Sequence, residues 1–363
     1  MHSWMRAMSV TWNHWCATWA RAARVASCLL IGGHAALVSA QTPPADGTTP
    51  PAPLTSVQLQ ALERATQSVV AVRSEAVEGA RSARTLGPQR EGSGVVIGTE
   101  GLILTIGYLV LEADAVVVED HHGRMLPARV VAQDLNTGLA VLQTRAPLRL
   151  QPAPLGEASG AGRSDPLLVA SGGEGGQATL ATLLSRRAYS GYWEYHLDEA
   201  LYTTPARRDH SGAGLFNLRG ELVGVGSLVL NNVASTGQPR TAGNLFVPVD
   251  LFRPVLEQLQ RSGRWAGDTR AWLGVNCTER EGEIWVVRVA EDSPAERAGL
   301  AVGDRIVSID GEAVTELSAL WKTLWRGQAE REVTLQVRRH GLVRQVLVRT
   351  IDRATTLKQA TGV

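Results

Sequence analysis

Short apolar runs separated by glycine-rich turns fill the middle of the chain. The first is Ser68–Arg73 (SVVAVR), and similar runs are centred near Val95, Val116, Val130, Val141, Leu167, Leu180 and Leu222. Short runs rich in β-branched residues at this spacing are typical of antiparallel sandwiches and barrels. The pattern therefore predicts a mainly β fold with a pair of β-barrels, preceded by a helix over Ser56–Gln67.

Helical spacing of apolar residues returns in the last third of the chain. A strand starting at Gly243 is followed by an amphipathic pattern through Leu259, which predicts a closing helix. The sequence Arg261–Arg264 (RSGR) breaks that helix and places a domain boundary near residue 266. Further on, four apolar residues recur at helical spacing and predict one more helix: Leu317, Leu320, Trp321 and Leu324.

The first 40 residues have the pattern of a cleaved signal peptide. They contain three arginines, no acidic residue and an apolar run over 25–38, and they end in Val38-Ser39-Ala40. Gly32, Gly33 and His34 interrupt the run, which is too short to span a bilayer comfortably. We therefore expect an exported chain, periplasmic in a bacterium, that begins at Gln41; retention of the leader as an anchor stays open. Residues 41–54 are a proline-rich linker.

Composition narrows the possible partners and ligands. The chain has 363 residues with 44% hydrophobic residues, as expected for two soluble domains. Removing the leader's three arginines changes the formal net charge from +1 to about −2, so neither nucleic acid nor an anionic membrane is expected as a partner. Cys16 and Cys28 lie in the leader, which leaves Cys277 without an internal disulfide partner.

The segment Asp120–Gly123 (DHHG) permits two interpretations. Adjacent histidines beside an acid suggest a metal site, whereas a glycine-closed polar segment between two apolar runs suggests a hairpin turn. Adjacent residues point apart and no third ligand is evident, so we favour the turn. Neither a metal nor a cofactor is expected.

A candidate nucleophile lies in the segment Ser211–Asn217 (SGAGLFN), just before the apolar run Glu221–Gly226. A serine among small residues before a β-rich segment is where a tight loop presents a hydroxyl to a carbonyl carbon. The segment resembles the nucleophile loop of HtrA-type, trypsin-fold serine proteases. The resemblance is close at Leu215–Asn217 and Gly220–Gly224, and it weakens at the immediate neighbours of Ser211.

The resemblance implies two partners for Ser211, in the chain order His, Asp, Ser. The segment 92–105 resembles the stretch before the catalytic His, but the implied position holds Tyr108. The segment 130–142 resembles the stretch around the catalytic Asp, but that position holds Gly138. Asp209 occupies the position of a glycine whose N–H helps to form the oxyanion hole, where a carboxylate would repel the developing oxyanion.

The C-terminal region resembles a bacterial PDZ domain in three segments, 271–275, 293–300 and 302–311. The resemblance implies a loop whose backbone N–H groups bind a C-terminal carboxylate while the peptide adds as a strand. The loop residues are Trp272, Leu273, Gly274 and Val275. Most of the apolar helical stripe belongs to the core, and one edge of it, Leu320 or Leu324, would line the peptide pocket.

These segments give the domain organisation that we expect: signal peptide 1–40, linker 41–54, trypsin-like domain 55–265, PDZ domain (α+β) 266–353 and tail 354–363. The main hypothesis is an exported pseudoprotease, acting as a chaperone or adaptor in protein quality control, that binds peptide C-termini or unfolded polypeptide. The alternative is a serine endopeptidase that uses Ser211 with an unconventional base. A purely structural or oligomerising protease domain, and a homo-oligomeric state, stay open.

Neither candidate for an unconventional base is strong. His210 is adjacent to Ser211 and Asp209, but consecutive residues on a tight loop project in different directions. Tyr108 can hydrogen bond to Ser211, but a phenol with a pKa of about 10 is a poor base at neutral pH. The sequence therefore favours a protein without protease activity, but it does not exclude an enzyme.

Overall fold

The computed structural model describes residues 53–162, 165–173, 176–235, 237–262 and 269–358. The predicted signal peptide, nearly all of the predicted linker and the domain boundary near residue 266 lie outside these ranges. Within them, helix α2 (Ser56–Gln67) confirms the first predicted helix. Thr55 caps it, accepting a hydrogen bond from the Gln58 N–H while the Gln58 side chain accepts from the Thr55 N–H.

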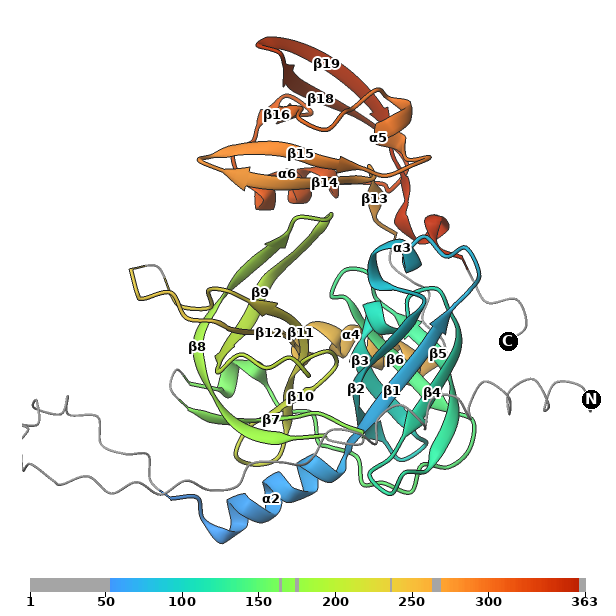
Figure 1. Ribbon diagram of the computed structural model, residues 1–363, viewed down its shortest axis with the longest axis vertical. Coiled ribbons are helices and arrows are strands. Elements are labelled where there is room, and N and C mark those ends of the chain that lie inside the picture. Colours follow the sequence, from blue (N-terminus) through green and yellow to red (C-terminus); the bar gives the residue numbers. More distant parts are fainter. Residues whose placement is uncertain (1–52, 163–164, 174–175, 236, 263–268, 359–363) are drawn as a thin grey trace, which may run out of the picture. The chain divides into compact units, whose positions relative to one another are not determined.

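The first half of the trypsin-like region is a closed six-stranded antiparallel barrel (Figure 1). Its strands pair in the order β1-β2-β3-β6-β5-β4. They are β1 (Val69–Ala76), β2 (Gln89–Gly98), β3 (Leu102–Ile106), β4 (Ala113–Glu119), β5 (Met125–Gln133) and β6 (Leu139–Thr144). Between β4 and β5, Asp120 Oδ1 accepts hydrogen bonds from the N–H groups of His122 and Arg124. The hairpin turn predicted there is therefore present.

The second half is another closed barrel, paired in the order β10-β11-β12-β9-β8-β7 (Figure 1). Its strands are β7 (Pro166–Ala170), β8 (Ala178–Gly191), β9 (Tyr195–Thr204), β10 (Gly214–Phe216), β11 (Leu222–Leu230) and β12 (Gly243–Pro248). A 3-10 turn, η3 (Val249–Phe252), and helix α4 (Arg253–Ser262) follow β12, as the closing-helix pattern predicts. Among the described residues, β8 and β9 form the hairpin with the longest strands, of 14 and 10 residues.

Three short helical segments join the strands: α3 (Ala83–Leu86), η1 (Gly107–Leu109) and η2 (Ala158–Gly160). Buried side chains fill the two barrels, with Tyr202, Phe216 and Phe246 among the largest. Several of the strands are buried over consecutive residues, β12 along its whole length, so both faces of these strands are covered. No helix in the described part of the chain is long and apolar enough to cross a membrane.

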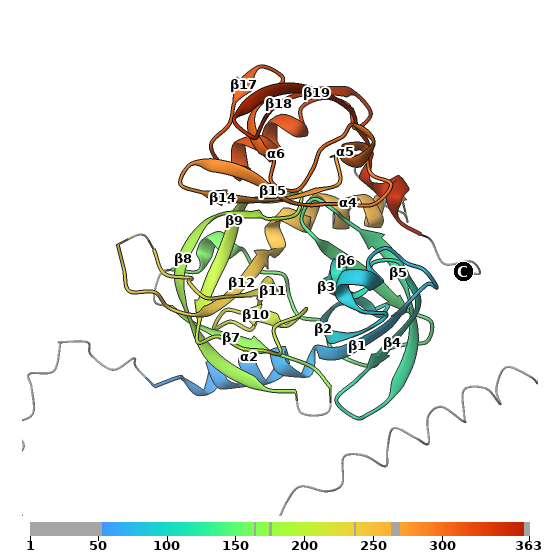
Figure 2. The ribbon, with the colours of Figure 1, turned by 45° about the horizontal axis from the view of Figure 1, so that its top comes forward.

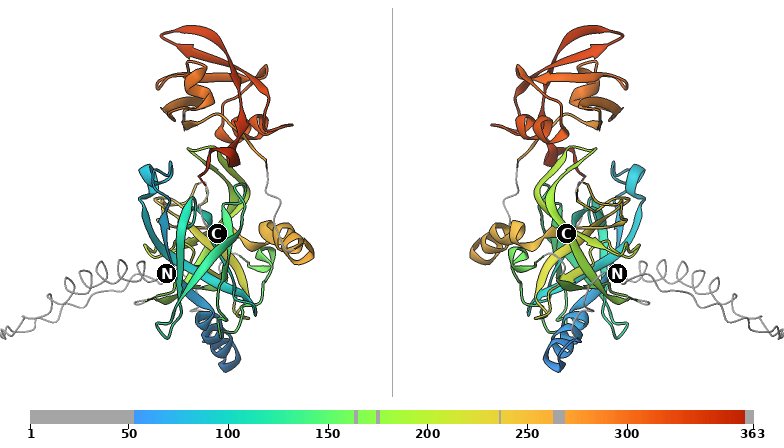
Figure 3. Two further views of the ribbon diagram at one scale, coloured as in Figure 1. Left: turned by 90° about the vertical axis from the view of Figure 1, so that its right-hand side faces the viewer. Right: turned by 90° about the vertical axis from the view of Figure 1, so that its left-hand side faces the viewer.

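The C-terminal region forms an α+β domain with its own hydrophobic core (Figures 2 and 3). Its main sheet pairs in the order β14-β15-β16-β18-β19, with β17 attached to β16, and β13 pairs with β20. The elements are β13 (Ala271–Trp272), β14 (Val275–Arg280), β15 (Glu283–Val289), α5 (Pro294–Arg297), β16 (Arg305–Ile309), β17 (Glu312–Ala313), α6 (Leu317–Leu324), β18 (Glu332–Arg339), β19 (Leu342–Arg349), β20 (Ile351–Asp352) and η4 (Arg353–Thr356). Cys277 is buried and has no disulfide.

Candidate active site and candidate peptide-binding loop

Ser211 lies on the loop between β9 and β10 and is held where the two barrels meet. The Ser93 N–H, on β2 of the first barrel, donates a hydrogen bond of 2.8 Å to the Ser211 carbonyl. Gly212 has φ +73°, and a Cβ there would come within 1.9 Å of the Ser93 carbonyl oxygen. A larger residue is therefore excluded at position 212. The glycine directly after Ser211 reflects this close approach of two backbones.

Tyr108, on η1, is the side chain that contacts the Ser211 hydroxyl. Tyr108 Oη lies 2.8 Å from Ser211 Oγ and 2.9 Å from the carbonyl oxygen of Ser227. The phenol can donate its one O–H to only one of these two acceptors at a time. When it donates to the Ser227 carbonyl, the serine hydroxyl can in turn donate a hydrogen bond to Oη. Burial raises the pKa of Tyr108 to about 12, partly opposed by the hydrogen bond with Ser211. The phenol is therefore neutral and a weak base.

Gly138 lies in a backbone conformation that an aspartate adopts only with strain. Its φ is +75°, and its carbonyl accepts a hydrogen bond of 2.6 Å from the Gly107 N–H, next to Tyr108. A Cβ on residue 138 would lie 3.3 Å from Tyr195 Oη, and that hydroxyl donates to the Thr137 carbonyl at 2.6 Å. The side of Gly138 to which a carboxylate would extend is therefore occupied by Tyr195, which the sequence analysis missed.

The Asp209 carboxylate is already paired. Arg207 Nε donates to Asp209 Oδ1 at 3.0 Å, and Arg207 Nη2 and the Ser171 hydroxyl bond Oδ2. Burial alone would raise the pKa of Asp209, but the bonds from Arg207 and Ser171 hold it below its usual value. The negative charge expected beside Ser211 is thus partly neutralised by an arginine two residues earlier. The side-chain amide of Asn244 holds the backbone of that arginine, because Asn244 Oδ1 accepts from the Arg207 N–H and Asn244 Nδ2 donates to the Arg207 carbonyl.

His210 points its Nδ1 at the loop's own backbone. Nδ1 lies 3.1 Å from the carbonyl oxygen of Arg207 and 3.0 Å from that of Arg208. Because carbonyls only accept, Nδ1 carries a proton in these contacts. Burial lowers the pKa of His210. With Asp209 bonded to Arg207 and Ser171, the three adjacent side chains form no Asp-His-Ser relay.

The loop of Trp272–Val275 has the geometry of a carboxylate-binding site. The N–H groups of Leu273, Gly274 and Val275 all donate to one carboxylate, that of Glu194, at 3.0, 2.6 and 3.0 Å. Gly274 has φ +88°, and a Cβ there would lie 2.3 Å from Ser293 Cβ, so only glycine fits.

Burial raises the pKa of the Glu194 carboxyl, while the three N–H groups and nearby Arg353 oppose the rise. Sequence reasoning missed Glu194. Its one available signal is the aromatic cluster Tyr192-Trp193-Glu194-Tyr195 at the turn between two strands. Of the remaining candidates, Trp272 is half-buried on β13, and Leu320 and Leu324 are fully buried on α6 among the core residues.

No group of three or more His, Cys, Asp or Glu side chains arranged for a metal ion occurs among the residues that the structure describes. At the Ser211 loop, the structure places the Tyr108 phenol in hydrogen-bond contact with the Ser211 hydroxyl. A hydroxyl hydrogen-bonded to a neutral phenol is not activated for attack on a peptide bond.

Comparisons with known proteins agree with the two-domain fold. Residues 92–225 match the trypsin-like peptidase domain family, and residues 271–350 match the PDZ domain family. The chain is similar to "Serine endoprotease DegS" of Haemophilus influenzae, at 28% identity over 71% of this chain and 76% of the relative. It is also similar to "Probable periplasmic serine endoprotease DegP-like" of Halomonas elongata, at 28% identity over 75% of this chain and 58% of the relative.

Solved structures give the same fold. The "HtrA-type protease AlgW with decapeptide" superposes with a TM-score of 0.52 at 22% identity, covering 82% of this chain and 98% of that one. This chain spans somewhat more than half the length of the DegP-like relatives that it matches.

Proposed function

The chain is a member of the HtrA family, with a trypsin-like peptidase domain followed by a PDZ domain, and from this premise we propose that it is an exported binding protein that does not hydrolyse its clients. It holds C-terminal or unfolded peptide segments through its PDZ domain and serves protein quality control or an adaptor role. The observation that carries the proposal is the Ser211 hydroxyl bonded to a half-buried neutral phenol at the position where the family has histidine.

The size of the expected loss supports a binding role. Removing the triad of a comparable serine protease lowers kcat about 10⁶-fold, which turns ~10 turnovers per second into about one per day. Here Tyr108 and Gly138 replace two of the three groups. Backbone donors alone leave too little catalysis to process client proteins.

The second candidate is a serine endopeptidase that acts through Ser211 with an unconventional base. The names of the relatives favour it directly, because the DegS and DegP-like proteins above are named as serine endoproteases. Under this hypothesis Tyr108 is the general base that deprotonates Ser211, because its hydroxyl is in hydrogen-bond contact with Ser211 Oγ. Its pKa of about 12 leaves roughly 10⁻⁵ of the molecules with a phenolate at pH 7.

Casein cleavage separates the two candidates. At pH 7 we expect the purified mature protein to leave unfolded casein intact and Ser211 unlabelled by a fluorophosphonate, with Ser211→Ala as the matched control. If Tyr108 phenolate is the base, cleavage rises about tenfold per pH unit without a plateau up to the highest pH that the fold tolerates, because the ionised fraction rises that way below a pKa of about 12. Ser211-dependent cleavage at neutral pH refutes the binding-protein proposal.

Export is part of the proposal, supported by the predicted leader and by the relatives named as periplasmic. We expect the exported protein to begin at Gln41, because Val38-Ser39-Ala40 fits a signal-peptide cleavage site. N-terminal sequencing of protein recovered from the periplasm measures this. A product that retains residues 1–40 contradicts cleavage and favours an anchor.

A further inference from the structure

A segment of the same chain occupies the strand-addition edge of the PDZ domain. Tyr192–Glu194, at the tip between β8 and β9, lies along β14 (Figure 2). Trp193 pairs with Asn276 in an antiparallel bridge, and the Cys277 N–H donates a hydrogen bond of 2.6 Å to the Tyr192 carbonyl. This is the pairing that a peptide makes when it adds to the edge of a PDZ sheet.

The direction of the segment also matches that of a bound peptide. Tyr192 pairs with Cys277, and Glu194 lies two residues later at the loop of Leu273–Val275, where a peptide would end. The chain does not end there but continues into β9. The Glu194 side chain supplies the carboxylate instead, and the three backbone N–H groups of the loop donate to it.

Further contacts bury this carboxylate and fix the hairpin. Glu194 is only 3% exposed, and Arg353 Nη1 donates to its carbonyl oxygen at 2.9 Å. The indole N–H of Trp321, on α6, donates to the Gly191 carbonyl at 3.1 Å. A buried carboxylate is tolerated only where donors replace water, so the loop and Glu194 complement each other.

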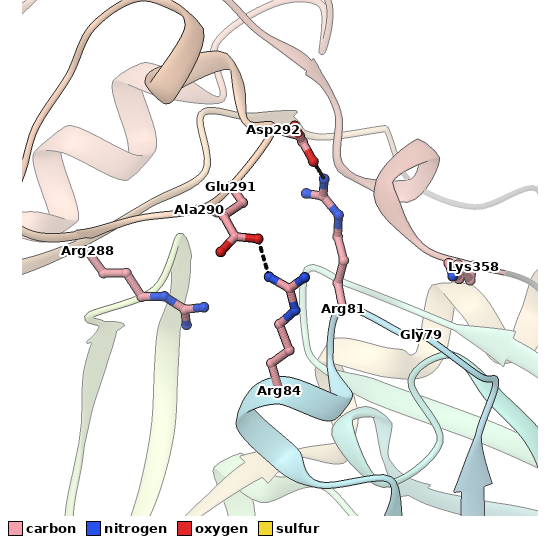
Figure 4. A pocket seen from close by; sticks show the side chains of 8 residues that line it. All are labelled: Gly79, Arg81, Arg84, Arg288, Ala290, Glu291, Asp292 and Lys358. Carbon is pink, nitrogen blue, oxygen red and sulfur yellow. Dashed lines mark hydrogen bonds and ion pairs between the residues drawn. The ribbon is translucent and has the colours of Figure 1, made fainter.

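Other ion pairs between the barrels and the PDZ domain are weaker than the Glu194 contact. Arg84 pairs with Glu291, and Arg81 Nη2 lies 3.7 Å from Asp292 Oδ2, beside a cavity of about 190 Å³ (Figure 4). Asp198 on β9 pairs with Lys322 on α6 at 2.6 Å. All of these side chains are largely exposed, and exposed ion pairs contribute little because water screens them. The Glu194 insertion is therefore the specific contact.

We propose that Tyr192–Glu194 is an internal ligand of the PDZ domain, whose Glu194 carboxylate stands where the C-terminal carboxylate of a peptide would bind. The inference rests on the proposed peptide-binding function and adds that the full-length chain is self-occluded. A peptide with a free C-terminus must displace the hairpin, so its apparent affinity is lowered by the fraction of molecules in which the groove is open. The same loop thus accepts a side-chain carboxylate presented by a β-hairpin.

The test uses the full mature chain and a dye-labelled peptide, Ala-Tyr-Ser-Gly-Tyr-Trp-Val, which repeats residues 188–193 and ends in a free carboxylate. We expect Glu194→Ala to bind it at least about tenfold more tightly than the natural chain, since the competing charged hydrogen bonds are gone. Asp198→Asn is the matched control: it removes an exposed ion pair of the same hairpin and should change affinity less than about threefold. The amidated peptide should bind all variants weakly.

Hydrogen exchange at Leu273–Val275 separates this inference from the proposed function. In Glu194→Ala these amides should exchange at least about tenfold faster than in the natural chain, because they lose their acceptor. Faster exchange without peptide binding supports the internal ligand and overturns C-terminal peptide binding. Tight peptide binding by the natural chain, with exchange unaffected by Glu194→Ala, overturns the internal ligand and leaves the function standing. If Glu194→Ala does not fold, Glu194→Gln, which keeps the volume, takes its place.

Discussion

Proteolysis through Ser211 should return when Tyr108→His, Gly138→Asp and Asp209→Gly are combined with Tyr195→Phe, and should be much weaker without the fourth change. The three replacements restore the base, its carboxylate and the oxyanion-hole glycine that the family resemblance implies. The structure adds an obstacle, because a Cβ on residue 138 meets Tyr195 Oη at 3.3 Å. The φ of +75° adds strain of about 1–2 kcal/mol for a non-glycine residue.

The readout is casein cleavage at pH 8, with Ser211→Ala added to the quadruple variant as the control. We expect the cleavage rate of the quadruple variant to exceed that of the natural protein by roughly 10³-fold or more. Each single change should recover almost no activity, because triad members act as a unit. If the triple variant, which keeps Tyr195, were as active as the quadruple variant, Tyr195 would not hinder the aspartate. Inactivity of both would place the defect elsewhere in the loop of Arg207–Ser211.

Trp321→Ala should lower the free energy of unfolding of the PDZ domain by about 3–5 kcal/mol, the range for deleting a large buried side chain. Trp321 is fully buried on α6 and is the largest side chain in that core. Its indole also stacks near Trp325, with ring centroids 6.4 Å apart. The measurement is guanidinium unfolding of the full mature chain, followed by circular dichroism. The unfolding transition that moves to lower denaturant in Trp321→Ala gives the change in free energy.

Trp321→Phe distinguishes packing from the contact with the β8–β9 hairpin. Phenylalanine keeps most of the buried ring but cannot donate to the Gly191 carbonyl. We expect a loss of about 1–3 kcal/mol, mainly from leaving that carbonyl without its donor. Equal losses for the two variants would mean that the hydrogen bond, and not the core volume, governs this position.

The β-barrels and the PDZ fold could be predicted because their signals are local. The short apolar runs, the turn at Asp120 and the helix Ser56–Gln67 each reside in a few consecutive residues, and the structure confirms them. The family resemblance extended this to the fold as a whole, including the candidate nucleophile Ser211. In the structure Tyr108 Oη lies beside Ser211 Oγ.

Other features depend on residues far apart in the chain. The sequence predicts an unpaired negative charge at Asp209. In the structure its carboxylate accepts hydrogen bonds from Arg207 and from Ser171, which is 38 residues away in the chain. Gly138 looked like a simple loss of a carboxylate, but its φ and the hydroxyl of Tyr195 oppose the return of an aspartate.

The sequence by itself determined the mainly β fold, the trypsin-like domain followed by a PDZ domain, and the identities of the residues at the expected triad positions. It did so because periodicity, turn residues and motif spacing act over short stretches. Only the tertiary structure decided that the carboxylate-binding loop of Leu273–Val275 faces Glu194, 79 residues or more earlier in the chain. Backbone N–H groups leave no trace in the identity of their residues, so the carboxylate that they bind can be found only once the chain is folded.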